Sequence, residues 1–209
     1  MSAGSVLPAL ADLVLAPRCA GCGEPGRWFC IACRDLCDPV TLRSPLRVRG
    51  VGTYAGPLRE AIHRLKYGGE RALAADLGAL VAREVAADLA RGVALDALVP
   101  VVLHRTRAAQ RGYDQARLLA AAVARRTGLP VRAALHRARV GRPQVELDRM
   151  ARAANVRRAF LAEARSLAGL RVALVDDVAT TGATLADAAA AARAAGARDV
   201  RAYVIGVDA

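Results

Sequence analysis

The sequence predicts an α/β protein with a doubly wound, mostly parallel sheet and a small zinc knuckle at its N-terminal end. Short apolar runs of strand length alternate with longer Ala- and Leu-rich stretches of helical period, the pattern of repeated βα units. Two Cys-x-x-Cys pairs precede these units and predict a metal-binding segment. We therefore divide the 209 residues into 1–45, an N-terminal helix and knuckle with a linker, and 46–209, the α/β domain.

The amino-acid composition and charge indicate what kind of partner the protein binds. Hydrophobic residues make up 55% of the chain, which is ample for a core, whereas aromatic residues make up only 3%. The formal net charge is +12, and the whole excess lies in residues 104–171, which hold 16 basic and 4 acidic side chains. A surplus confined to one stretch predicts a localised anionic partner.

The sequence does not predict insertion into a membrane. No segment reaches the roughly 18–20 apolar residues of a membrane span. The apolar run from Val6 to Pro17 is short, is interrupted by Asp12 and has no Lys or Arg before it. It predicts a short amphipathic helix rather than a secretory signal, and we expect a cytoplasmic location.

The N-terminal cysteines are spaced as zinc ligands. Cys19 and Cys22 form one pair and Cys30 and Cys33 the other, with seven residues between the pairs. Four thiolates at this spacing suit tetrahedral Zn²⁺, whose binding would supply most of the folding free energy of so short a segment. Disulfides and a redox-active pair are the weaker alternatives in a reducing compartment. Cys37 is either a spare buried thiol or a replacement for one of the four.

The first half of the α/β domain predicts one strand and two helices. Residues 38–47, with two prolines, predict a linker, and residues 47–55 a strand. A helix over 58–67 carries Lys66, the only lysine beside thirty arginines. Its compact ammonium is either needed against a phosphate or belongs to a solvated helix end. Residues 70–91 predict a long helix with one apolar stripe.

A basic segment follows the second predicted strand. Residues 96–103 predict this strand and residues 116–126 the next helix. The loop between them contains Gly112 and three arginines, which are Arg105, Arg107 and Arg111. At the carboxyl end of a strand this group suits a pyrophosphate or a nucleic-acid backbone, although a solvated arginine face is the alternative for each of them.

A second basic segment predicts a flap. Residues 131–136 predict a strand, and residues 137–158 a mobile flap over the strand ends, with a short helix around 147–154. A disordered basic loop is the alternative. The residues of the flap that we expect to contact a ligand or a nucleic acid are Arg139, Arg142, Gln144, Arg152 and Asn155. The chain then predicts a buried strand ending near Val175, a helix over 183–195 and a strand over 199–207.

The stretch after Val175 carries the predicted chemistry. Asp176 and Asp177 follow a buried strand, at the edge where open α/β sheets bind ligands. The next residues offer backbone N–H groups, three hydroxyls and a glycine at the start of a helix; they are Ala179, Thr180, Thr181, Gly182, Ala183 and Thr184. This loop suits a phosphate, and the two carboxylates suit the hydroxyls of a ribose, directly or through Mg²⁺. The alternative is an ordinary strand, turn and capped helix.

Val175-Asp-Asp-Val-Ala-Thr-Thr-Gly-Ala-Thr184 closely resembles the phosphoribosyl pyrophosphate (PRPP) motif of type I phosphoribosyltransferases. The resemblance extends over nearly the whole chain to the ComF family, late-competence proteins with a zinc finger joined to a phosphoribosyltransferase-like domain. Its further motifs are Leu65-Lys-Tyr-x-Gly69, Val99-Pro-Val, Arg111-Gly-Tyr-x-Gln115, Pro143-Gln144 and Arg152-x-x-Asn-Val156. Asp114, Val102 and Gly141 depart from the family pattern and affect the expected shape of the pyrophosphate side.

The resemblance implies a type I phosphoribosyltransferase-like fold, PRPP binding at Asp176, Asp177 and the loop Thr180–Thr184, and a role in importing transforming DNA as single strands. Two functions are compatible with it. In an enzyme, Asp176 and Asp177 would orient the ribose, and Lys66, Arg105 or Arg111 would stabilise the leaving pyrophosphate. In a binding module, PRPP would be a regulatory ligand and the arginines of 104–171 would contact single-stranded DNA. A third hypothesis is a structural partner of a DNA-translocating helicase, docked through the zinc knuckle.

Overall fold

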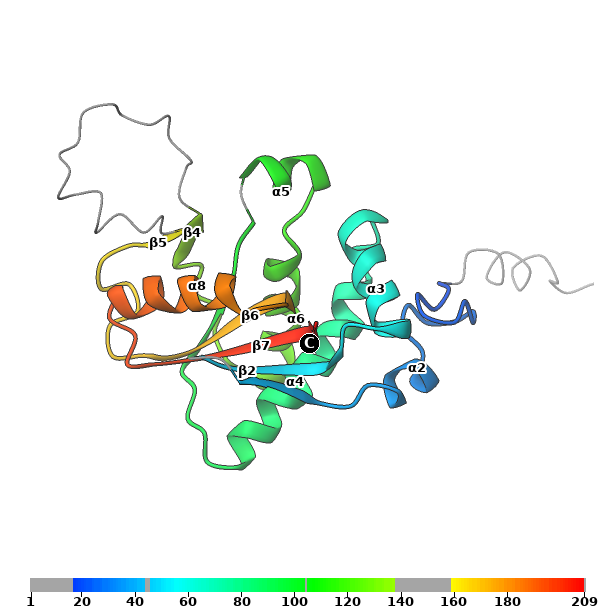
Figure 1. Cartoon of the computed structure of the whole chain (residues 1–209), viewed down its shortest axis with the longest axis horizontal. Helices are drawn as coiled ribbons and strands as arrows, with labels where there is room; N and C mark the ends of the chain where they lie inside the picture. The colour runs from blue at the N-terminus through cyan, green and yellow to red at the C-terminus, as the bar shows by residue number, and fades with distance from the viewer. Residues whose placement is uncertain (1–16, 44–45, 104, 138–158, 209) are drawn as a thin grey trace, which may run out of the picture.

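The computed structural model describes residues 17–43, 46–103, 105–137 and 159–208. A five-stranded sheet forms its centre (Figure 1). In spatial order the strands are β1 (Val40–Arg43), β2 (Arg47–Thr53), β7 (Asp199–Val207), β6 (Arg171–Ala179) and β3 (Ala97–Pro100). β1 is antiparallel to β2, and the other neighbours are parallel. The predicted α/β class with a mostly parallel sheet is confirmed.

Helices and a small hairpin cover the two faces of the sheet. The helices are α2 (Ile31–Asp35), α3 (Gly56–Tyr67), α4 (Leu73–Ala90), α5 (Arg105–Arg111), α6 (Gln115–Thr127) and α8 (Ala183–Ala194), and the hairpin is β4 (Leu135–Arg137) with β5 (Phe160–Ala162). One apolar core joins α3, α4 and α6 to the sheet and to the knuckle, and a second joins α8 and the hairpin to the other face. Figure 1 shows α8 and α4 on opposite sides of the sheet.

Small side chains let these layers pack closely despite the low aromatic content. α8 buries a row of alanines against the sheet, among them Ala188, Ala189 and Ala192. Gly78 of α4 lies against α6, and a Cβ at this position would come within 2.5 Å of the Ala122 Cβ. The close contact between α4 and α6 therefore depends on a glycine at position 78. Among the described residues, no helix has the length and apolar character needed to cross a membrane.

Two predicted elements differ from the structure. Residues 40–43 of the expected linker form β1, because the alternating side chains of Val40 and Leu42 pack against the second core while the backbone pairs with β2. The expected strand 131–136 is reduced to one bridge from Val131 to Leu98, since β3 is only four residues long and offers few pairing positions. Residues 135–137 pair with β5 instead.

Candidate functional site

The two neighbouring carboxylates lie inside β6 and not after it. β6 continues to Ala179 because β7 runs beside it in parallel register, with Asp176 opposite Val204 and Ala179 opposite Val207. This corrects the expectation that the strand ends near Val175. Successive side chains of a strand point to opposite faces, so the two carboxylates point to different faces at the carboxyl end of the sheet.

Asp177 is held from two helices. Lys66 Nζ, in the last turn of α3, lies 2.7 Å from Asp177 Oδ1, and Gln115 Nε2, at the first residue of α6, donates to Asp177 Oδ2 at 2.7 Å. Asp177 is only 5% exposed. A buried carboxylate with these two partners is fixed in place, and Lys66 meets it rather than open solvent.

Gln115 carries no role in the predictions from sequence, although it ends the motif that begins at Arg111. The signal for it is an amide at the first residue of a helix, just after a strand end. Gln115 is 2% exposed, and its Oε1 has no hydrogen-bond partner among the described residues. A buried acceptor without a partner, on the side chain that holds Asp177, marks Gln115 as a candidate functional residue.

Asp176 is less enclosed than Asp177. Its Oδ1 accepts a hydrogen bond from the Asp177 N–H at 2.8 Å. Burial, and then the neighbouring charge of Asp177, raise the pKa of Asp176 well above its ordinary value of 3.8. A half-buried carboxylate beside the hydroxyls of the following loop offers oxygen ligands that fit Mg²⁺ shared with phosphate oxygens.

The loop from Ala179 to Thr184 has the features expected of a phosphate site. Gly182 has φ 76° and precedes α8 directly, so the turn uses the conformation that glycine favours. Ala179 is buried in the second core. The residues exposed to solvent are Thr180, Thr181, Ala183 and Thr184. Their N–H and hydroxyl groups therefore face solvent at the N-terminus of a twelve-residue helix.

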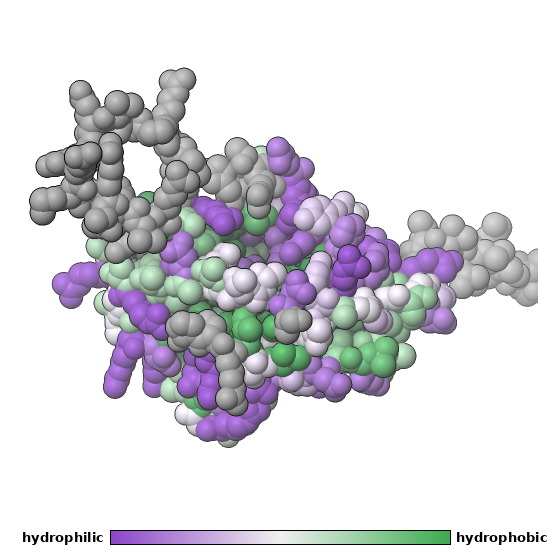
Figure 2. Space-filling model, viewed as in Figure 1, coloured by the Kyte–Doolittle hydropathy of each residue, from purple (hydrophilic) through white to green (hydrophobic). Residues whose placement is uncertain are grey.

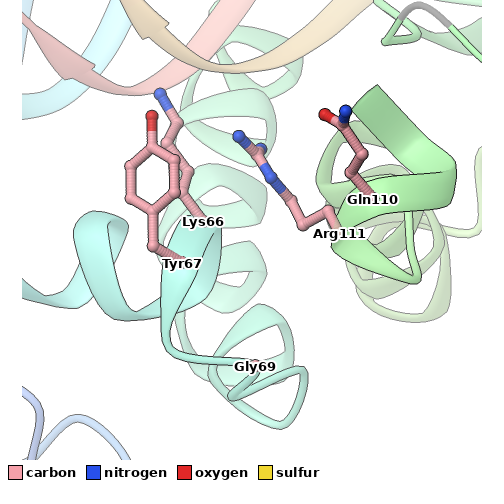
Figure 3. A pocket seen from close by; sticks show the side chains of 5 residues that line it. All are labelled: Lys66, Tyr67, Gly69, Gln110 and Arg111. Atoms are coloured by element: carbon pink, nitrogen blue, oxygen red, sulfur yellow. The ribbon is translucent and has the colours of Figure 1, made fainter. Parts of the chain in front are cut away.

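The basic segment after β3 is a helix rather than a loop. Arg105 begins α5 and Arg111 ends it. The Arg111 guanidinium lies 5.0 Å from the centre of the Tyr67 ring, and its Nη1 is buried without a partner among the described residues. Together with Lys66, Gly69 and Gln110, these two side chains line a pocket of about 490 Å³ (Figure 3).

The end of α3 and the start of α6 are fastened to each other. Tyr113 donates a hydrogen bond to the Leu65 carbonyl, and Arg71 Nη2 donates to the Gly112 carbonyl at 2.9 Å. Asp114, which departs from the family pattern, caps α6 by accepting a hydrogen bond from the Arg117 N–H. These contacts bring two motifs that are distant in sequence to one edge of the sheet.

The candidate residues of the flap cannot be placed in this arrangement. Arg139, Arg142, Gln144, Arg152 and Asn155 lie outside the described residues.

The four cysteines of the knuckle come together as predicted. The sulfurs of Cys19, Cys22, Cys30 and Cys33 all lie within 4.8 Å of one another. The Cys19–Cys33 distance is 3.7 Å and the Cys22–Cys30 distance 3.6 Å, close to the roughly 3.8 Å that Zn–S bonds of about 2.3 Å give in a tetrahedron. The donor set therefore fits Zn²⁺. Cys37 stays outside it, and its thiol faces the Cys33 carbonyl at 3.4 Å.

Backbone N–H groups prepare one of these sulfurs as an anion. Burial acts to raise the pKa of the Cys19 thiol, but hydrogen bonds from Cys30, Cys22 and Gly21 outweigh it and bring the pKa to about 6. The Gly21 and Cys30 N–H groups lie 3.4 and 3.3 Å from the Cys19 sulfur. Such N–H groups orient and stabilise a thiolate ligand.

Comparison with known proteins gives two kinds of relatives. No family model matches the chain. The DNA utilization proteins YhgH of Salmonella typhimurium and of Escherichia coli K12 are each 33% identical to it over 175 residues, which are 82% of this chain and 75% of theirs. Competence protein F of Haemophilus influenzae is 29% identical over 193 residues, which are 90% of this chain and 83% of that protein.

The solved structures that resemble the chain are larger proteins. An allosteric regulatory enzyme of purine biosynthesis matches 63% of this chain and 25% of its own length, with a TM-score of 0.46 and 27% identity. A glutamine PRPP amidotransferase from B. subtilis, complexed with ADP and GMP, matches the same shares with a TM-score of 0.44. This chain thus spans about a quarter of the length of these proteins.

Proposed function

The chain belongs to the ComF family, whose members include the DNA utilization proteins YhgH and competence protein F, and we propose from this that it binds PRPP or a related phosphorylated ribose. We further propose that it acts on single-stranded DNA during DNA uptake. The observation that supports the ligand is the carboxyl end of β6. Two carboxylates there precede an exposed Thr-rich turn with Gly182 at φ 76°.

Each part of this edge has a role toward such a ligand. The N–H and hydroxyl groups of Thr180 to Thr184 bind the 5-phosphate, aided by the positive end of the α8 dipole. Asp176 accepts hydrogen bonds from the ribose hydroxyls. Mg²⁺ bound with the ligand would neutralise phosphate charge beside these carboxylates.

Lys66 and Gln115 act on the ligand through Asp177. Their contacts at 2.7 Å hold this carboxylate in place, so it need not reorganise when the ribose enters. The DNA part of the proposal is supported by the charge distribution, since residues 104–171 carry the whole net positive charge. A DNA-translocating helicase is the protein partner that we propose for the transport itself.

The alternative function is Mg-dependent phosphoribosyl transfer to a base or nucleotide-related acceptor. The pocket lined by Lys66 and Arg111 favours it, because it adjoins Asp177 through Lys66 and has room for a second reactant. The test is pyrophosphate release when the zinc-loaded protein is mixed with Mg-PRPP and the common bases. No release with any of them would leave the binding function alone.

Titration calorimetry with Mg-PRPP tests the binding function. We expect Asp176→Asn to weaken binding by roughly 1.5–3 kcal/mol, the size of a lost hydrogen bond to a charged group, which is about 10- to 150-fold. Glu163→Gln is the matched control, because Glu163 is an exposed carboxylate in the turn before β6, and it should bind as the wild type does. A wild type that shows no heat with Mg-PRPP would reject the proposal.

A further inference from the structure

One aromatic side chain of the protein, that of Tyr67, is exposed to solvent. Tyr67 ends α3 with 68% of its surface exposed. The chain has only seven Trp, Tyr and Phe residues, all of them among the described residues, and the other six are buried or half-buried. Core packing therefore does not account for an aromatic residue at position 67.

Tyr67 stands at a cationic pocket rather than on an apolar surface. The Arg111 guanidinium lies 5.0 Å from its ring centre, and the His63 ring 4.9 Å from it. Figure 3 shows the Tyr67 ring and the Arg111 guanidinium pointing into the same space, with Lys66 beside them. Figure 2 shows mostly hydrophilic side chains over this part of the molecule, around α3 and α5. An apolar ligand is thus not the natural occupant.

Arg111 presents an unsatisfied donor group at this pocket. Its guanidinium lines the pocket, and its buried Nη1 has no partner among the described residues. A guanidinium pairs well with a phosphate oxygen. A ligand that pairs with Arg111 and also covers the Tyr67 ring combines an aromatic ring with a negative charge.

A nucleotide has both properties. We propose that Tyr67 and Arg111 form a stacking subsite for one base of a DNA single strand, with a phosphate of the strand on the Arg111 guanidinium. A base in a duplex is covered on both faces by its neighbours, so an exposed tyrosine ring favours an unpaired base. The pocket of about 490 Å³ has room for one nucleotide. The inference rests on the proposed DNA-binding role and not on PRPP binding.

The experiment is fluorescence anisotropy of a labelled thymidine 15-mer titrated with the full-length, zinc-loaded protein. Removing a stacking ring weakens single-strand binding by roughly 5- to 150-fold, and we expect Tyr67→Ala to fall in this range while Tyr67→Trp retains affinity. Leu36→Ala is the control, because Leu36 is an equally exposed large side chain just after α2. It should bind as the wild type does.

Salt dependence separates the ring from the charge. Arg111→Ala should reduce the slope of log affinity against log salt by about 0.7, the value for one phosphate contact on a single strand. Tyr67→Ala should lower affinity at every salt concentration and leave the slope unchanged. Binding of the 15-mer that is insensitive to Tyr67→Ala would overturn the inference, as would a wild type that does not bind the 15-mer.

Two further measurements keep the outcomes distinct. If thymidine monophosphate competes as well as the unlabelled 15-mer at the same concentration, the site binds a mononucleotide. That result would also overturn the inference. Calorimetry with Mg-PRPP on Tyr67→Ala should give wild-type heat. A wild type that binds the 15-mer through Tyr67 but does not bind Mg-PRPP would reject the PRPP site and leave the stacking subsite standing.

Discussion

The four-cysteine knuckle and the proposed ligand edge, residues 176–184 at the carboxyl end of β6, both arise from short sequence motifs, but the structure completes them differently. All four sulfurs of the knuckle come from residues 19–33 and lie within 4.8 Å of one another. Asp177, in contrast, is held by Lys66 from α3 and Gln115 from α6. A site whose ligands are close in sequence is complete within its motif, whereas the other site depends on the packing of distant helices.

The knuckle is nevertheless packed onto the domain that carries the ligand edge. Phe29 is fully buried in the core of α3 and α4, and its N–H donates to Asp76 Oδ2 of α4 at 3.1 Å. Arg34 Nη2 donates to Asp76 Oδ1 at 2.6 Å. Arg64 of α3 contacts both the Cys19 carbonyl and Glu70. The four-cysteine knuckle therefore supports α3, the helix that presents Lys66.

Loss of the zinc ligands should have the largest effect. Cys19→Ser removes a ligand that is buried in the shared core, and we expect the zinc to be lost and the free energy of unfolding to fall by about 3–5 kcal/mol, or roughly 6–20 °C in Tm. Metal analysis and a thermal melt measure both quantities. Cys37→Ser is the matched control, since Cys37 lies outside the four-sulfur cluster, and it should keep one zinc per chain. A Cys19→Ser protein with wild-type zinc content and Tm would contradict the assignment.

Breaking the ion pair at Asp177 should have the next largest effect. Lys66→Met leaves a carboxylate that is 5% exposed with Gln115 as its remaining partner, and we expect a loss of about 2–3 kcal/mol in urea unfolding. The double variant Lys66→Met, Asp177→Asn removes the unpaired charge and should recover part of this loss. If the losses of unfolding free energy in Lys66→Met and Asp177→Asn add up to that of the double variant, the 2.7 Å contact between Lys66 and Asp177 contributes no coupling energy.

The same contrast decides how much of each region could be predicted from the sequence. The spacing of Cys19, Cys22, Cys30 and Cys33 was sufficient for the cluster, because a turn brings the first pair together and the start of α2 brings the second pair together. The glycine turn before α8 also follows from its own residues, and φ 76° at Gly182 agrees with it. The last strand, 199–207, has the predicted bounds.

Contacts between distant segments could not be predicted from the sequence. Nothing in the local pattern says that Lys66 meets Asp177, because this depends on where α3 ends relative to β6. The bounds of β6 and β1 were missed for a similar reason, since they depend on pairing with β7 and β2. The helical form of Arg105–Arg111 was missed because arginine is compatible with both a loop and a helix.

A change at the turn of the ligand loop should have a smaller effect on stability. Gly182→Ala places a Cβ on a residue with φ 76°, which costs about 1–2 kcal/mol, and should also weaken Mg-PRPP binding by distorting the phosphate loop. Gly128→Ala is the matched control, because Gly128 has φ 73° at the end of α6 and its Cβ would meet no atom within 4 Å. It should lose similar stability and keep its affinity. Equal affinities of the two variants would argue against the phosphate loop.

The smallest effect is expected at the opposite edge of the sheet, where β3 and β6 begin. Asp96 accepts hydrogen bonds from the Arg171 side chain at 2.7 and 2.9 Å and from the Arg171 N–H at 2.8 Å, and these lower the pKa of Asp96 from 3.8 to about 2. The pair is partly exposed and screened by solvent, so its contribution to stability is small. Because the pKa is lower in the folded state, this contribution is complete above about pH 4 and is lost as the pH falls toward 2. Asp96→Asn should therefore be slightly less stable than the wild type at pH 7, with the difference narrowing between pH 4 and 2 in urea unfolding, and should bind Mg-PRPP normally. A loss of Mg-PRPP affinity in Asp96→Asn would mean that the ligand edge is not confined to the carboxyl ends of the strands.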